Sequence, residues 1–183
     1  MNSVDSAPST LDSSDVVSGE RPALHIVLYE PEIAANTGAV GRTCVGLGAK
    51  LWLVEPLGFQ IDDRKLKRAG LDYWQYLEWE IVPDWQTLKT RIASANGVAE
   101  NEQRFFYFTK RGARSYDSIC FRSGDALVFG AESRGLPNSF LTDDSRTLRI
   151  PIRPQIRSLN LSVSVAVAAF EVRRQWRVQA AKP

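Results

Sequence analysis

From residue 24 onward the chain alternates short apolar runs with longer segments that open or close on helix-capping residues. Asn36 and Asp84 are typical N-cap residues, while Gly48 and Asn96-Gly97 are typical helix ends. The predicted strands are 24–29, 51–54, 80–82, 104–109, 126–129 and 148–152. The predicted helices are 36–47, 63–69, 84–95 and 159–177. This alternation is typical of an α/β fold, a mostly parallel sheet with helices on both faces.

Glycine and polar residues gather after three of the predicted strands, in 30–42, 130–135 and 151–160. Ligand sites of open parallel sheets form at the carboxyl ends of the strands. We therefore expect the chemistry of this protein in these three loops.

The first loop leads into the helix that holds Asn36 and Arg42. The two residues lie just under two helical turns apart, which predicts that both face one site. An arginine there can hold a phosphate with two parallel hydrogen bonds. The alternative is an N-cap asparagine beside a solvated arginine.

The second and third loops also carry candidate ligand-binding residues. A buried strand runs into Gly130, which permits close backbone approach, and Glu132 follows. This stretch has neither a Gly-x-Gly-x-x-Gly motif nor a Walker lysine, which argues against dinucleotide and nucleoside triphosphate sites. In the third loop two prolines interrupt regular structure, and then Ser158 and Asn160 precede an apolar helix. Here the alternative is that Ser158 serves only as an N-cap.

Charge is distributed unevenly along the chain. The net charge is +2, but residues 1–20 hold four acids and neither Lys nor Arg, so 21–183 carries 23 basic and 17 acidic residues. A basic body fits an anionic partner such as RNA. Residues 1–20 are rich in Ser and Asp and predict a disordered tail. We expect 21–183 to form a single domain.

Several classes of protein are disfavoured by composition. No apolar run reaches the ~18–20 residues that span a bilayer, and the N-terminus lacks the pattern of a secretory signal. Cys44 and Cys120 are far apart in sequence and predict reduced thiols in a cytoplasmic protein. His25 is the only histidine, which excludes a multi-histidine metal cluster, and no metal is expected.

Taken in order, the three loops resemble the three sequence motifs of the SPOUT methyltransferases, in the branch of tRNA ribose 2′-O-methyltransferases. The likeness is greatest to the small bacterial enzymes that methylate the wobble nucleotide, cytidine or uridine 34. It spans about residues 23–177. The stretches that carry it are Val27-Leu-Tyr-Glu-Pro-Glu-Ile33, Arg68-Ala-Gly-Leu-Asp-Tyr73, Phe129-Gly-Ala-Glu-Ser-Arg-Gly-Leu-Pro137 and Arg157-Ser-Leu-Asn-Leu-Ser162.

The resemblance implies a SPOUT fold whose C-terminal part is threaded into a trefoil knot and binds S-adenosylmethionine. By motif position the cofactor-binding residues are Phe108, Thr109, Gly130, Glu132, Ile150, Ser158 and Leu159. Members of this family are homodimers whose tRNA site crosses the interface. The dimer face expected here lies on the long C-terminal helix, with Val163, Ala166, Val167, Phe170 and Trp176.

In the resembled family the arginine at the position of Arg42 is the proposed general base, and Asn36 belongs to the same catalytic motif. Arginine is normally always protonated, so the alternative is that Arg42 binds an RNA phosphate and positions the ribose hydroxyl. The anticodon stem-loop of tRNA would meet a basic surface. The residues expected to contact tRNA are Arg64, Lys65, Lys67, Arg68, Arg153 and Asn160.

Two other functions remain open at this stage. One is a related methyltransferase that acts on another tRNA position or on rRNA. The other is a non-catalytic RNA-binding module, which would bind tRNA without S-adenosylmethionine.

Charge reversal at Lys65 and Lys67 should weaken tRNA binding and flatten its salt dependence, because fewer phosphate contacts release fewer counterions. Binding titrations of the double variant Lys65→Glu/Lys67→Glu at several salt concentrations measure this slope. A slope equal to that of the wild type would place the RNA elsewhere.

Overall fold

The computed structural model describes residues 24–60 and 72–181, and in these ranges the strands form one seven-stranded sheet of order β3-β2-β1-β6-β4-β7-β5. Every strand pairing is parallel. The strands are β1 (Leu24–Tyr29), β2 (Lys50–Val54), β3 (Trp79–Val82), β4 (Phe105–Phe108), β5 (Arg114–Ser115), β6 (Asp125–Phe129) and β7 (Thr147–Arg149). The α/β fold with a mostly parallel sheet is thus confirmed.

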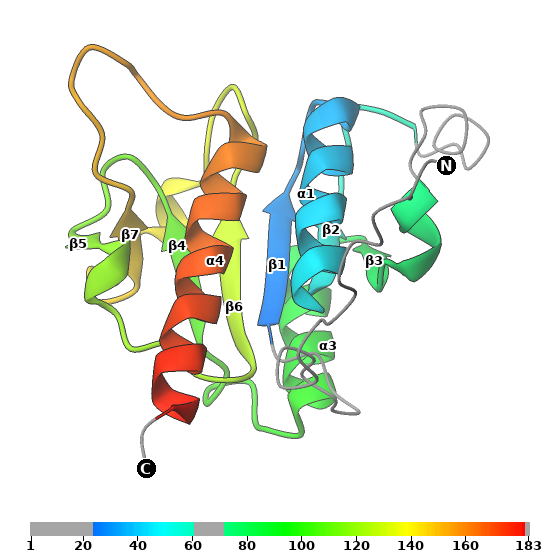
Figure 1. Cartoon of the computed structure of the whole chain (residues 1–183). Coiled ribbons are helices and arrows are strands. Elements are labelled where there is room, and N and C mark those ends of the chain that lie inside the picture. The colour runs from blue at the N-terminus through cyan, green and yellow to red at the C-terminus, as the bar shows by residue number, and fades with distance from the viewer. Residues whose placement is uncertain (1–23, 61–71, 182–183) are drawn as a thin grey trace, which may run out of the picture.

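Helices cover both faces of this sheet (Figure 1). The α-helices are α1 (Ala34–Leu47), α3 (Trp85–Asn96) and α4 (Leu161–Ala180), and the short 3-10 helices are η2 (Asp72–Tyr76), η3 (Tyr116–Ser118) and η4 (Asn138–Phe140). Helices α1 and α4 pack side by side on one face, while α3 covers the other.

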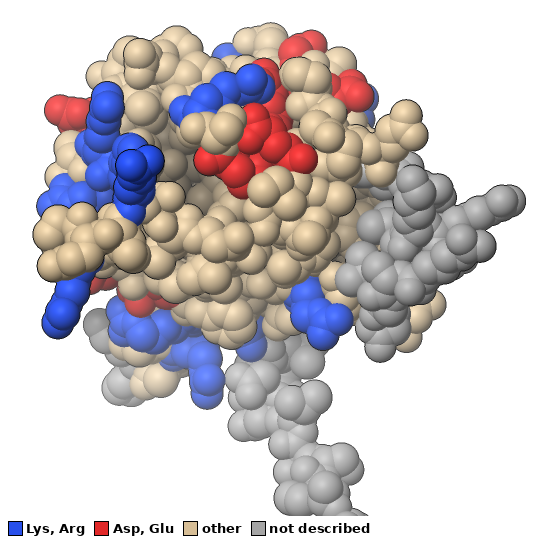
Figure 2. Space-filling view, turned by 90° about the horizontal axis from the view of Figure 1, so that it is seen from above, with Lys and Arg blue, Asp and Glu red and all other residues tan. Residues whose placement is uncertain are grey.

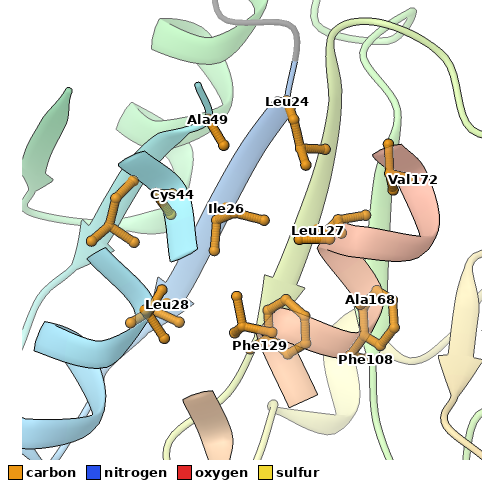
Figure 3. Close-up of a cluster of buried hydrophobic side chains, with 14 of the residues drawn as sticks. Leu24, Ile26, Leu28, Cys44, Ala49, Phe108, Leu127, Phe129, Ala168 and Val172 are labelled. Carbon is orange, nitrogen blue, oxygen red and sulfur yellow. The ribbon is translucent and has the colours of Figure 1, made fainter. Parts of the chain in front are cut away.

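The alternation of side chains along the strands explains the two layers. In β1, Leu24, Ile26 and Leu28 point toward α1 and α4, where they join the larger hydrophobic cluster shown in Figure 3. Val27 lies between them in sequence and points toward α3, where it joins the second cluster. A strand buried on both faces needs a continuous apolar run, and 24–29 supplies one.

Local signals predicted three of the helix ends correctly. Asp84 caps α3 by accepting a hydrogen bond from the Thr87 backbone N–H at 2.7 Å. Gly97 ends α3 and Gly48 ends α1, both in the left-handed region at φ 66° and 64°. These are contacts between residues a few positions apart, which a sequence pattern can reveal.

Neither Asn36, which the sequence predicts as a cap, nor Ser158, for which a cap is the alternative, caps a helix. Helix α1 begins at Ala34 behind Ile33, which makes no side-chain cap bond, so Asn36 lies inside the first turn. Helix α4 begins at Leu161, and its N-cap is Asn160, whose side chain accepts from the Ser162 N–H at 2.9 Å. Ser158 lies two residues before this cap. Asn36 and Ser158 are therefore available for other contacts.

The structure also differs from the prediction at the end of β7 and at the short strand β5. Strand β7 ends at Arg149, before Pro151, which has no N–H to donate to a neighbouring strand. The two-residue strand β5 gave no apolar signal. The predicted tail 1–20 and helix 63–69 lie outside the described residues, and the trefoil knot stays a prediction. Both cysteines are free; Cys44 is buried and Cys120 is exposed.

A buried polar network lies at the amino ends of the strands. The Trp52 indole N–H donates to His25 Nδ1 at 3.0 Å, so the proton of the neutral ring sits on Nε2, which lies 3.0 Å from Asn96 Oδ1. Nearby, the buried carboxylate of Asp125 lies 3.1 Å from Arg104 Nε. Burial lowers the pKa of His25 to about 4 and raises the pKa of Asp125 to about 6.

These two groups have opposite effects on stability in acid. Between about pH 6.5 and 4 the unfolded chain protonates His25 and the folded chain does not, so acidification destabilises the fold. Between about pH 6 and 4 the folded chain protonates Asp125 before the unfolded chain does, so acidification stabilises it.

Replacing Asp125 by Asn removes this compensation. Between pH 6.5 and 4.5 the Asp125→Asn variant should lose about 2 kcal/mol more of its free energy of unfolding than the wild type. Urea titrations at the two pH values measure the difference, with the exposed Asp144→Asn as control. A variant that follows the wild type across this range would show that Asp125 does not titrate as its burial implies.

Candidate active site

Three loops meet at the carboxyl ends of the strands, and the carboxylate of Glu132 joins them. Glu132 Oε2 accepts from the backbone N–H of Glu32 at 2.8 Å, and its Oε1 accepts from Asn36 Nδ2 at 2.8 Å. The Asn36 side chain in turn accepts from Asn160 Nδ2 at 3.0 Å. Residues more than ninety positions apart thus form one chain of hydrogen bonds, and the expected convergence of the three loops is confirmed.

A second carboxylate strengthens the junction between the first two loops. Glu32 accepts from the Ser133 hydroxyl at 2.7 Å and from the Ser133 backbone N–H at 2.9 Å. These hydrogen bonds hold the pKa of the Glu32 carboxyl below its usual value, so the group stays ionised.

The first loop contains a strained residue. Glu30 is the one non-glycine residue with positive φ (52°) in the described part of the chain. Its side chain pairs with Arg134 of the second loop, and its backbone N–H donates to Val54 O at 3.0 Å. Strained backbone of this kind persists where the surrounding contacts fix it, and it clusters at functional sites.

The loops enclose a cleft of about 740 Å³. Figure 2 shows the molecule from this side, with a hollow that has acidic residues gathered on one side and basic residues on another. The cleft is lined by all seven residues expected to bind the cofactor, together with Asn36 and Asn160. Those seven are Phe108, Thr109, Gly130, Glu132, Ile150, Ser158 and Leu159. The basic residues of the lining are Lys110, Arg111, Arg134 and Arg157.

Gly130 is required by a contact within the protein. A Cβ atom added to it would lie 2.2 Å from the carbonyl carbon of Gly135 and 2.3 Å from the backbone nitrogen of Leu136. Both are backbone atoms, which cannot move aside as the end of a side chain can. Gly130 thus lets the loop fold back on itself and form one wall of the cleft.

Comparison with known proteins agrees with this geometry. The model of the SpoU rRNA Methylase family matches residues 23–170. The chain belongs to the SpoU rRNA methylase family. A tRNA (cytidine(34)-2′-O)-methyltransferase of Burkholderia ambifaria is 45% identical over 153 residues, which are 82% of this chain and 94% of that protein.

Solved structures of similar proteins support the same assignment. One, concerned with the 2-OH methylation of C/U34 on tRNA, is 43% identical with a TM-score of 0.75, and the match covers 86% of this chain and 98% of that one. The SpoU methyltransferase AviRb from Streptomyces viridochromogenes, solved with AdoMet, has a TM-score of 0.72 over 91% of this chain and 62% of its own. At 19% identity it shares the fold.

One residue expected in the active site of this SpoU family member lies apart from the cleft. Arg42 is exposed on α1, and its guanidinium carbon lies 4.6 Å from the centre of the Tyr73 ring. Asn36 lines the cleft and Arg42 does not. The expectation that both face one site is wrong for a single chain, since six residues at about 100° each turn the second side chain to another side of the helix.

The residues expected to contact tRNA divide into three groups. Arg64, Lys65, Lys67 and Arg68 lie outside the described residues. Asn160 belongs to the hydrogen-bond chain of the cleft. Arg153 is exposed on the loop after β7, beyond the lining of the cleft.

Four residues of the site had no role assigned from the sequence: Glu30, Glu32, Ser133 and Arg134. They lie in the two loops that the motifs mark, so the sequence predicted that these residues would lie near the site. Their hydrogen-bond and ion-pair partners could not be predicted, because Glu32 and Ser133, for example, are 101 residues apart in sequence. In the described part of the chain no group of three or more His, Cys, Asp or Glu could hold a metal ion, and no helix there could cross a membrane.

The close approach at Gly130 can be tested by a single methyl group. Gly130→Ala should lower the free energy of unfolding by about 2 kcal/mol or more, because backbone must move to admit the Cβ. Gly46→Ala is the control, since a Cβ there meets nothing within 4 Å and alanine favours the helix by about 0.5–1 kcal/mol. Denaturant titrations compare the two. Equal stability of Gly130→Ala and the wild type would contradict the contact.

Proposed function

We propose that this protein transfers the methyl group of S-adenosylmethionine to the ribose 2′-hydroxyl of nucleotide 34, the wobble position, of tRNA. The observation that carries the proposal is the junction of the three motif loops around Glu132, in a chain that resembles nucleotide-34 methyltransferases over most of its length. Cytidine and uridine are the expected bases, and the cytoplasm is the expected location.

The cleft fits the cofactor in size and chemistry. A volume of about 740 Å³ is within the usual range for a small-molecule site, about 300–1,000 Å³. S-adenosylmethionine, when bound, supplies an electrophilic methyl group on a positively charged sulfur. Glu132 provides a carboxylate in the wall, and each of its oxygens keeps a free lone pair after bonding Glu32 or Asn36.

The other residues of the cleft would hold the cofactor through shape and backbone groups. Phe108 and Thr109 close one side, Gly130 forms the tight turn, and Ile150, Ser158 and Leu159 come from the loop after β7. Lys110, Arg111 and Arg157 line the same cleft and carry the charge that an RNA phosphate requires.

The ribose hydroxyl is a poor nucleophile and must lose its proton as it attacks. Asn36 donates to Glu132 and accepts from Asn160, so these two side chains hold Glu132 and the third loop together. Arg42 binds the backbone phosphate and positions the hydroxyl, or it takes the proton, as the family resemblance implies.

We further propose a homodimer in which the tRNA site crosses the interface. Helix α4 buries Leu161, Val165 and Val172 against its own sheet and leaves Val163 and Phe170, of the expected dimer face, 47% and 56% exposed. Trp176 of that face packs against the core instead. Because Arg42 lies outside the cleft of its own chain, a partner subunit offers a way to bring an Arg42 to the cleft.

Arg42→Ala should reduce methyl transfer by at least about 100-fold while affinity for S-adenosylmethionine is kept, since Arg42 does not line the cleft. Label transfer to tRNA gives the rate and calorimetry gives the affinity. The control is Arg91→Ala, an exposed arginine on α3 at the opposite face, which should keep the wild-type rate.

The position of methylation is tested by mass-spectrometric mapping of tRNA from a strain that lacks this protein. Loss of the 2′-O-methyl group at nucleotide 34, restored by the wild type and not by Arg42→Ala, is the expected result. Loss at another nucleotide, or tRNA binding without transfer, would contradict the proposal.

A further inference from the structure

The stretch Arg68-Ala-Gly-Leu-Asp-Tyr73 takes part in the family resemblance, and Tyr73 does not line the cleft. Its described end, Tyr73, lies in η2 and contacts α1 at two points. The ring lies under the guanidinium of Arg42, and the hydroxyl donates to Gly38 O at 2.6 Å. We propose that Tyr73 is a positioning residue that fixes the side chain of Arg42 for methyl transfer; this rests on the proposed function.

The two contacts act on one helical turn. In an α-helix the carbonyl of residue 38 accepts the backbone N–H of residue 42. The Tyr73 hydroxyl therefore bonds to the carbonyl that also holds the backbone of Arg42, and the ring lies against the side chain of the same residue. The Tyr73 side chain thus contacts both the backbone turn that holds Arg42 and the guanidinium of Arg42.

The ring contact leaves the functional groups of Arg42 available. A cation over an aromatic face is attracted to it without using its N–H groups as hydrogen-bond donors. A planar guanidinium has five such donors, arranged to bind a phosphate with two of them. Tyr73 thus restrains the guanidinium and leaves those donors to a substrate, whereas a carboxylate partner would occupy them.

The position of Tyr73 is itself fixed by Trp74 of η2 and by Leu77, the residue that follows η2. A Cβ on Gly41 would lie 2.9 Å from the Trp74 ring and 3.0 Å from Leu77, so both side chains pack directly on the α1 backbone beside Arg42. Trp74 also packs against Trp79 of β3, with ring centres 5.4 Å apart. Trp74 packs η2 onto α1, and this packing fixes the position of Tyr73, the preceding residue of η2.

Kinetics separate the ring from the hydroxyl. Tyr73→Leu should lower kcat about 10-fold with little change in affinity for S-adenosylmethionine, whereas Tyr73→Phe keeps the ring and should stay within about 3-fold of the wild type. In the Arg42→Ala background, Tyr73→Leu should cause no further loss, because the residue it positions is gone. Tyr116→Leu, the same change in η3, is the control and should keep the wild-type kcat.

A readout without tRNA tests the contact directly. In protein labelled with nitrogen-15 arginine, the Arg42 Nε–H resonance, assigned with Arg42→Lys, should carry a ring-current shift. The shift should persist in Tyr73→Phe and vanish in Tyr73→Leu.

Three results would overturn the proposal: a wild-type kcat in Tyr73→Leu, equal losses in the Leu and Phe variants, or a further loss on the Arg42→Ala background. A wild-type protein that transfers no methyl group to tRNA would count against the proposed function. In that case the Arg42 resonance still decides whether Tyr73 holds Arg42.

Discussion

The carboxylate of Glu132 is the point on which the arrangement of the cleft depends. It accepts from the backbone of the first loop and from Asn36 of α1, and Asn36 accepts from Asn160 at the start of α4. Removing one member of such a chain leaves its partners without a hydrogen-bond partner within the protein. The strands of the sheet fix where each loop begins, and the hydrogen bonds between the loops fix how they lie relative to one another.

Backbone contact supplies the second constraint. Gly130 lies against Gly135 and Leu136, and a Cβ on Gly112 would come within 2.3 Å of the Leu148 carbonyl carbon. At both places main chain packs on main chain. Gly130 lines the cleft, and Gly112 directly follows Lys110 and Arg111 of its lining, so these contacts restrain segments that form its walls. A rigid cleft places its binding groups before the ligand arrives, which lowers the entropic cost of binding.

The fold could be predicted from the sequence because its signals are local. The apolar runs gave the main strands, and Asp84, Gly97 and Gly48 marked helix boundaries through contacts within a few residues. Asn36 and Ser158 misled for the opposite reason: both are residue types that cap helices, but their places were decided by distant partners or by the cleft. The motifs located the loops, and no spacing rule could pair Glu32 with Ser133 or Arg42 with Tyr73.

The contact between Gly41 and Trp74 couples two positions that are distant in sequence. The Trp74 indole packs against the backbone of Gly41 and leaves no room for a larger residue at position 41. A substitution at one of these two positions therefore constrains the residue at the other. A bulkier residue at position 41 would require a smaller side chain than Trp74 in the 3-10 turn. The attachment of η2 to α1 therefore depends on residues 41 and 74 together. Changing either residue alone would loosen the turn that carries Tyr73.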